Sequence, residues 1–169
     1  MVADAGLLSN SNVKQLINNG YDFILGARIK NERQAIKAQI LSLKLKDGQS
    51  GTINKDNLRL IISYSDARAR KDQQNRQRGL KALEKKIKSG RLTKSSINNK
   101  GYNKFLKLEG EISVKIDQNK VQQETGWDGL KGYLTNSELS TSEVFENYSH
   151  LWQIEKAFRV AKSELKIRP

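Results

Sequence analysis

The sequence predicts an α/β fold in which a mixed sheet is flanked by helices and interrupted by a basic segment. A strand, a helix and a second strand follow one another within residues 1–30, an order typical of neighbouring parallel strands. Further strand-like segments surround a helix rich in lysine and arginine. The chain then ends in a long helix with an apolar stripe.

Residues 1–30 form the first β-α-β unit. Val2, Ala3 and Asp4 are expected to form a short strand end that Gly6 closes, and "YDFILGARI", residues 21–29, has the aromatic and aliphatic composition of a buried strand. Between them, one apolar helix face is formed by Val13, Leu16 and Ile17. Functional groups of open α/β sheets lie just past the carboxyl ends of strands, and Asp4 occupies such a place.

Residues 31–125 contain most of the positive charge. The segment begins with the helix-like "NERQAIKAQILSL" and the strand-like "LRLIISYS". Residues 66–104 then hold 13 basic and three acidic residues, a net charge of +10. We expect a helix in the first half of this stretch and strands or hairpins in "YNKFLKL" and "EISVKID". The candidate nucleic-acid-binding residues here are Arg68, Arg70, Arg76, Arg78, Lys85 and Lys86.

The composition limits the classes of function. The 169 residues include 31 Lys and Arg against 18 Asp and Glu, and the net charge of +13 favours nucleic acid as partner, with an anionic membrane surface second. No apolar run is long enough to span a bilayer. With no Cys and one His, a catalytic metal here needs carboxylate ligands, which suit Mg²⁺ or Mn²⁺.

Residues 126–169 contain a strand, "GWDGLKGYLTN", and the last helix. Ser140 and Glu143 have the spacing of a capping box at the start of that helix. One helix face then carries Tyr148, Trp152, Glu155, Arg159 and Lys162, at spacings of 4, 3, 4 and 3. A carboxylate at the edge of a buried stripe is costly unless it is paired or binds a metal. Glu155 therefore either pairs with Arg159 or Lys162, or is a catalytic ligand.

This helix resembles the C-terminal signature of DDE transposases from bacterial insertion sequences, Y-x(2)-R-x(3)-E-x(6)-K. Tyr148, Glu155 and Lys162 match at the required spacing. The preceding "DGLKGYLTN" resembles the family's last strand, and "VADAGLLS" resembles the strand that bears the second catalytic aspartate. The resemblance implies an incomplete ribonuclease H-like core in residues 1–30 and 126–169, with residues 31–125 as an insertion domain.

Two positions depart from the family pattern. Leu151 stands where the signature has arginine, and Arg159 on the same face is a candidate substitute for that phosphate contact. The first catalytic aspartate has no counterpart, because only three residues precede Asp4. We therefore expect a C-terminal fragment of a catalytic domain, or the product of a truncated gene, that binds DNA and is inactive by itself.

The resemblance implies metal-dependent DNA strand cleavage and transfer, with Asp4 and Glu155 as ligands of two divalent ions, Mg²⁺ or Mn²⁺. Lys162 is then a phosphate contact, and Tyr148 either contacts phosphate or packs. Trp127 either stacks on a flipped base or anchors its strand in the core. The alternatives to a transposase are a non-catalytic basic nucleic-acid-binding module and an inactive remnant.

The resemblance also implies partners and a location. The partner is DNA, both transposon ends and target, and a homodimer is possible in the complete protein. We expect no membrane association and a bacterial cytoplasmic protein that joins the nucleoid when it is bound to DNA.

Overall fold

The computed structural model describes residues 1–109 and 113–163, without the side chains of Leu7, Lys94, Trp152 and residues 154–163. The chain forms two compact units. Unit 1 comprises Met1–Ser63 and Lys131–Pro169, and unit 2 comprises Tyr64–Leu130.

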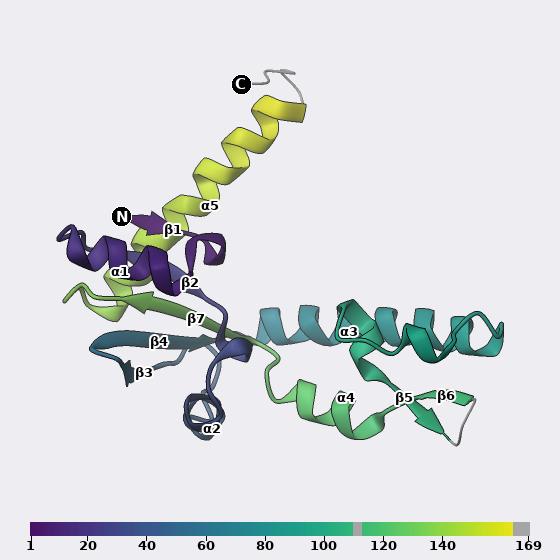
Figure 1. The fold of residues 1–169 in the computed structure, drawn as a ribbon. Helices are drawn as coiled ribbons and strands as arrows, with labels where there is room; N and C mark the ends of the chain where they lie inside the picture. Colours follow the sequence, from purple (N-terminus) through teal and green to yellow (C-terminus); the bar gives the residue numbers. More distant parts are fainter. Residues whose placement is uncertain (110–112, 164–169) are drawn as a thin grey trace. The chain divides into compact units, whose positions relative to one another are not determined.

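Unit 1 contains a five-stranded sheet with the strand order β1-β2-β7-β4-β3 (Figure 1). Its strands are β1 (Val2–Ala3), β2 (Ile24–Ala27), β3 (Ser50–Lys55), β4 (Leu58–Tyr64) and β7 (Leu130–Thr135). β1 and β2 are parallel, whereas β2 with β7 and β3 with β4 are antiparallel. The mixed sheet and the parallel β-α-β unit are therefore confirmed.

The core of unit 1 explains why β4 has a continuous apolar sequence. Leu60, Ile61 and Ile62 are all fully buried, as expected of a strand covered on both faces. Ile61 packs in one cluster with Ile24, Tyr133 and Val144. Because successive side chains of a strand point to opposite faces, Leu60 and Ile62 occupy the other side of the sheet.

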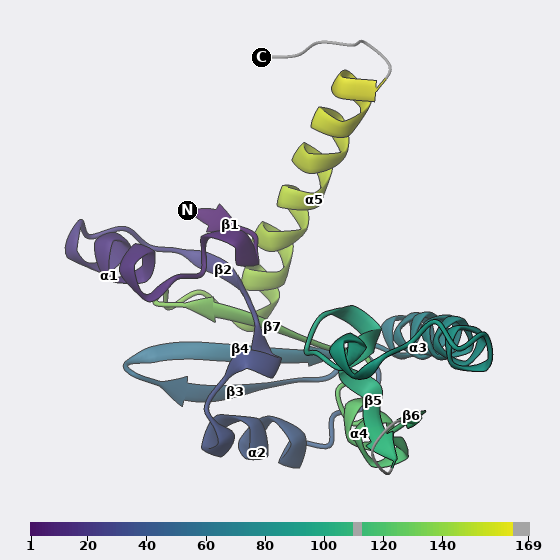
Figure 2. The ribbon, with the colours of Figure 1, turned by 45° about the vertical axis from the view of Figure 1, so that its right-hand side comes forward.

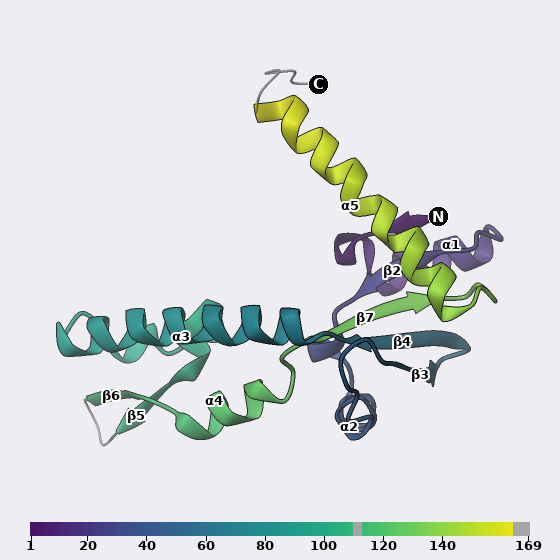
Figure 3. The ribbon, with the colours of Figure 1, turned by 180° about the vertical axis from the view of Figure 1, so that it is seen from behind.

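The described part of unit 1 contains the α-helices α1 (Asn10–Asn18), α2 (Gln34–Ser42) and α5 (Thr141–Ser163). α1 lies in front of the sheet in Figure 1, and α5 lies in front of it in the opposite view of Figure 3, so the two helices cover opposite faces. α2 lies beside the edge strand β3 (Figure 2). Gly20 ends the α1 segment with a positive φ of 70°, which glycine adopts without strain. Short 3₁₀ helices are formed by Ala5–Leu7 (η1) and Ile29–Asn31 (η2).

Unit 2 consists of a long helix, a hairpin and a short helix. α3 (Asp66–Lys88) is followed by the 3₁₀ helices η3 (Lys94–Ser96) and η4 (Gly101–Phe105). β5 (Leu106–Glu109) and β6 (Ser113–Ile116) then form an antiparallel two-stranded sheet, and α4 (Gln118–Thr125) follows. The buried residues of its core are Leu83, Phe105, Leu106 and Val114. The expected small sheet and basic helix are present.

Two elements were not expected from the sequence. β3 has the sequence "SGTINK", in which only Ile53 is buried, and α4 has the polar sequence "QNKVQQET" with no fully buried residue. The units also differ from the expected segments. β3 and β4 lie between residues 31 and 125, yet they belong to the same five-stranded sheet as β1, β2 and β7.

Candidate functional site

Asp4 lies directly after β1, at the carboxyl end of this strand. It caps η1, and its Oδ1 accepts a hydrogen bond of 2.7 Å from the backbone N–H of Gly6. A Cβ at position 6 would lie 2.8 Å from that oxygen, so a larger residue at position 6 would require the Asp4 carboxylate to shift. The Asp4 side chain is exposed. The local turn thus holds a carboxylate at the sheet edge where the sequence predicted one.

Tyr148 brings α5 to the same edge of the sheet. A Cβ built on Gly26 of β2 would lie 2.6 Å from the Tyr148 hydroxyl, 3.0 Å from the Ala5 nitrogen and 3.5 Å from the Asp4 carbonyl carbon. The Tyr148 hydroxyl and the backbone of Asp4 therefore meet over Gly26. The small residue at position 26 permits this approach, because any larger side chain would fill the same space.

The ring of Tyr148 is packed against β7. It stands edge-on to Tyr133, with ring centroids 4.9 Å apart, and Tyr133 also contacts the ring of Phe145 at 5.1 Å. The Lys131 Nζ lies 4.9 Å from the Tyr133 centroid and 4.4 Å from the Tyr148 centroid. Tyr148 was expected either to pack or to contact phosphate, and its ring does pack.

The start of α5 has the predicted capping box. The Ser140 N–H donates to Glu143 Oε2 at 2.8 Å, and the Glu143 N–H donates to the Ser140 hydroxyl at 3.3 Å. The Ser140 hydroxyl also donates to Glu143 Oε2 at 2.6 Å, and this bond lowers the pKa of Glu143 below its usual value. The cap orients the first turn of α5, and Val144 in that turn is fully buried against the sheet.

The remaining signature residues lie further along α5. Glu155, Arg159 and Lys162 are within the helix, but their side chains lie outside the described part of the structure. Glu155 follows Tyr148 by seven residues, which is two helical turns, or roughly 10 Å along the axis. The sequence-based roles of Glu155, Arg159 and Lys162 stay predictions.

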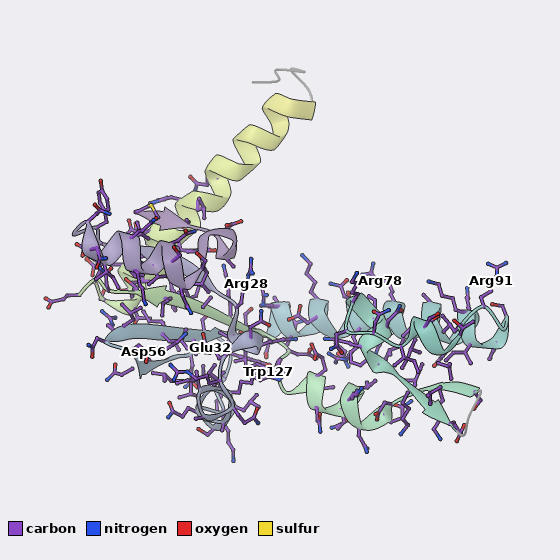
Figure 4. The ribbon with its side chains drawn as sticks, in the orientation of Figure 1. Arg28, Glu32, Asp56, Arg78, Arg91 and Trp127 are labelled. Carbon is purple, nitrogen blue, oxygen red and sulfur yellow. The ribbon has the colours of Figure 1, made fainter. Side chains whose placement is uncertain are left out.

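The basic helix α3 has one buried face and one charged face. Gly79 and Leu83 are buried within unit 2. The opposite face carries exposed basic residues at spacings of 8, 3, 4 and 3, namely Arg70, Arg78, Lys81, Lys85 and Lys88. Figure 4 labels Arg78 on this helix and Arg91 just past its end. Lys86 is also exposed, so most of the predicted DNA-binding side chains are accessible to a ligand.

Arg76 and Arg68 differ from the other basic candidates. Arg76 is only 9% exposed, and its two terminal nitrogens donate to the two carboxylate oxygens of Asp128 at 2.5 and 2.6 Å. The hydrogen bonds with Asp128 raise the pKa of Arg76, against the opposing effect of burial. Arg68 donates from Nε to the Leu130 carbonyl at 3.2 Å. Burial and pairing favour a structural role for Arg76 over contact with DNA.

Trp127 follows α4 and is partly buried (Figure 4). Its backbone N–H donates to the Glu124 carbonyl at 3.1 Å, which continues the last turn of the helix. The adjacent Asp128 binds Arg76, and Gly129 has a positive φ of 79°. The turn is thus tied to α3, while the choice between base stacking and anchoring for Trp127 stays open.

Sequence reasoning did not single out Gly26, Lys131 or Tyr133. The alternation of Lys131, Tyr133 and Thr135 in a strand places all three on one face. The register of β7 against β2, however, comes from residues more than 100 positions apart, such as Gly26 and Tyr133. The grouping around Asp4 therefore had no local signal.

Metal ligands are only partly visible in this site. The described residues include no group of three or more His, Cys, Asp or Glu side chains that could hold a metal ion. Asp4 supplies one exposed carboxylate of the type that hard divalent ions prefer. Nor do residues 1–109 and 113–163 include a helix with the length and apolarity to cross a membrane.

The mixed sheet, its flanking helices and the aspartate at the end of β1 define a ribonuclease H-like α/β fold. The family model of the transposase DDE domain matches residues 1–169, and the chain belongs to this family. Searches among curated proteins and among solved structures found no match. Members of this family are transposases, which act on DNA by polynucleotidyl transfer with divalent metal ions.

Proposed function

We propose that this chain forms part of the catalytic domain of an insertion-sequence transposase, which cleaves DNA at transposon ends and transfers the strands to a target. The observation that carries the proposal is the meeting of Asp4 and α5 over Gly26. The strand that bears an exposed carboxylate and the helix that bears Glu155 thus lie side by side at one edge of the sheet.

Asp4 and Glu155 are the proposed ligands of two divalent ions, Mg²⁺ or Mn²⁺. Such ions activate the attacking hydroxyl and stabilise the leaving oxygen of an in-line displacement at phosphorus. Asp4 is held in position by its hydrogen bond to Gly6. Cleavage needs a further carboxylate beyond these two, so we expect this chain alone to bind DNA without cutting it.

DNA binding is assigned mainly to the exposed face of α3 in unit 2. Cations at Arg70, Arg78 and Lys85 recur along one side of the helix, as required to follow a phosphate backbone. We propose that unit 2, which overlaps the insertion expected at residues 31–125, binds DNA through this face. On α5, Arg159 and Lys162 are the proposed phosphate contacts near the reacting strand.

The test of catalysis compares two glutamates of α5 in the complete transposase. Glu155→Gln removes a ligand charge at nearly constant shape, and Glu146→Gln removes an exposed charge two and a half turns earlier in the helix. We expect Glu155→Gln to abolish Mg²⁺-dependent cleavage of a labelled transposon end and to leave the mobility shift unchanged. Glu146→Gln should cleave at the parental rate. If Glu155→Gln also cleaves at that rate, Glu155 is a pairing or packing residue.

A second candidate function is DNA binding without chemistry, either as a basic module or as an inactive remnant. The charged face of α3 favours it, because this face needs no metal to bind phosphate. It predicts salt-dependent binding and no cleavage under any metal condition, even in the complete protein.

The transposase proposal also includes a location and an assembly state. The protein is expected to be cytoplasmic and to join the nucleoid when it is bound to DNA, and the complete transposase is proposed to act as a homodimer.

A further inference from the structure

Lys131 lies at the same sheet edge as Asp4 and has no role in the proposed chemistry so far. β1 pairs Ala3 with Leu25, so Asp4 lies beside Gly26, and Gly26 pairs in turn with Tyr133 of β7. β7 is antiparallel to β2, so the step from Tyr133 back to Lys131 runs toward the carboxyl ends of β1 and β2. Lys131 therefore lies at the same edge as Asp4, on the face of the sheet that carries Tyr133.

Two aromatic rings hold the Lys131 ammonium group in place. Its Nζ lies 4.9 Å from the Tyr133 centroid and 4.4 Å from the Tyr148 centroid, within the reach of a cation–π interaction. The planes of the two rings are at 79° to each other, so the rings pack edge to face. Because the Tyr148 hydroxyl meets the backbone beside Asp4, the same ring connects Lys131 to the carboxylate turn.

The surroundings of Lys131 differ from those of the paired lysines. Lys55 lies 2.7 Å from Glu32, and Lys104 lies 2.9 Å from Glu124. Among the described residues, no carboxylate forms an ion pair with Lys131, which is partly exposed. Aromatic faces attract a cation without neutralising it, so the positive charge remains available to an anion.

We propose that Lys131 binds a DNA phosphate beside Asp4, and that the Tyr133–Tyr148 ring pair positions its ammonium group for this contact. The inference rests on the proposed function, since it requires DNA at this edge of the sheet. A carboxylate that approaches DNA repels the phosphates, and a fixed cation next to it offsets that repulsion. Lysine acts here as a point charge with three donors. Arg28 is a further exposed cation, directly after the carboxyl end of β2 (Figure 4).

The first test measures how the affinity of this chain for duplex DNA depends on salt concentration. Duplex DNA is titrated with the parent, Lys131→Gln, Lys131→Arg and the control Lys46→Gln. Lys46 is an exposed lysine between α2 and β3, at the sheet edge away from β1. Loss of one phosphate contact should lower the slope of log affinity against log salt by about 0.9. Between 50 and 200 mM salt, that difference is about 3.5-fold in affinity. Lys131→Arg should restore the slope, and Lys46→Gln should keep it.

The second test follows the amine directly. Lysine acetylation is read by mass spectrometry with and without the duplex, and DNA should slow modification of Lys131 but not of Lys46. Should Lys131→Gln keep the parental salt slope of DNA binding and lower only the melting temperature, Lys131 is a packing residue or the counter-ion of a carboxylate. The inference about Lys131 then fails, while the proposed function is unaffected. If the parent chain binds no DNA, the proposed function fails and the inference fails with it.

Discussion

The Arg76–Asp128 pair offers a sharp test of how unit 2 uses its basic residues. We expect Asp128→Asn to destabilise unit 2, because it leaves the guanidinium of Arg76 without its anionic partner. Both side chains are largely buried, at 10% and 15% exposure, and their nitrogen and oxygen atoms make two parallel hydrogen bonds. The pair joins the middle of α3 to the turn after α4, 52 residues away.

The expected loss follows from the geometry of this pair. Removing one partner of a buried ion pair costs about 3–5 kcal/mol, since the other charge remains desolvated. The residual exposure of Arg76 and the oxygen kept by asparagine place the expected cost near the lower end, at about 3 kcal/mol. Such a loss corresponds to a roughly 100-fold lower protection of the α3 backbone amides against hydrogen exchange.

Hydrogen exchange along α3 is the appropriate measurement, and Arg78→Gln is the matched control. Arg78 lies on the same helix, but it is exposed. Its substitution should change stability by less than about 0.5 kcal/mol. It should also lower the salt slope of DNA binding by about 0.9. The two arginines, two residues apart, should thus separate a structural role from a DNA-binding one.

A double variant tests whether the interaction itself is responsible. Arg76→Gln combined with Asp128→Asn should cost at least about 1 kcal/mol less than the sum of the two single changes, because no unpaired charge remains. The reasoning is refuted if Asp128→Asn leaves α3 exchange unchanged, or if Arg76→Gln reduces the salt slope while stability stays at the parental level.

Two further predictions concern unit 1. Gly26→Ala should displace Tyr148, because the new Cβ would lie 2.6 Å from the tyrosine hydroxyl. We expect a loss of about 1–3 kcal/mol in the free energy of unfolding, measured by denaturant titration. An unchanged denaturation midpoint would show that Tyr148 moves aside at no cost. Glu143 has its pKa lowered by the Ser140 hydroxyl, so its contribution is present above the unfolded pKa of about 4.3 and is lost as the pH falls through the lower folded value. Glu143→Gln should therefore flatten the acid side of the stability profile, and a variant with the parental profile would exclude this linkage.

Local sequence signals were sufficient for much of the fold. The apolar run of β4, the glycine that ends α1 and the Ser140–Glu143 capping box each act over a few residues. Their effects depend on side-chain burial and backbone conformation within a turn or a strand. The same holds for Asp4, whose place after β1 follows from the β-α-β order. The transposase family could be predicted from the sequence for a similar reason, because the residues of its C-terminal signature lie within one helix.

The elements that were missed have polar sequences. β3 has one buried residue, Ile53, and is a strand because it pairs with β4 along six residues. α4 begins at an Asp117 side-chain cap and has no apolar stripe strong enough to predict a helix. In both, tertiary pairing or capping outweighs a weak local preference.

The sequence by itself determined the α/β class, the basic character of residues 66–104 and the candidate acids Asp4 and Glu155. Only the tertiary structure decided which cations are free for a ligand. The sequence does not distinguish Arg76 from Arg78, since both are arginines of one basic helix. The 3.6-residue helical period directs Arg76 toward Asp128 and Arg78 toward solvent. Lys131 likewise lies at the same edge of the sheet as Asp4 because of strand register, and its ammonium group lies over two aromatic rings. Such long-range contacts depend on how distant segments pack, and that packing leaves no periodic pattern in the sequence around either residue.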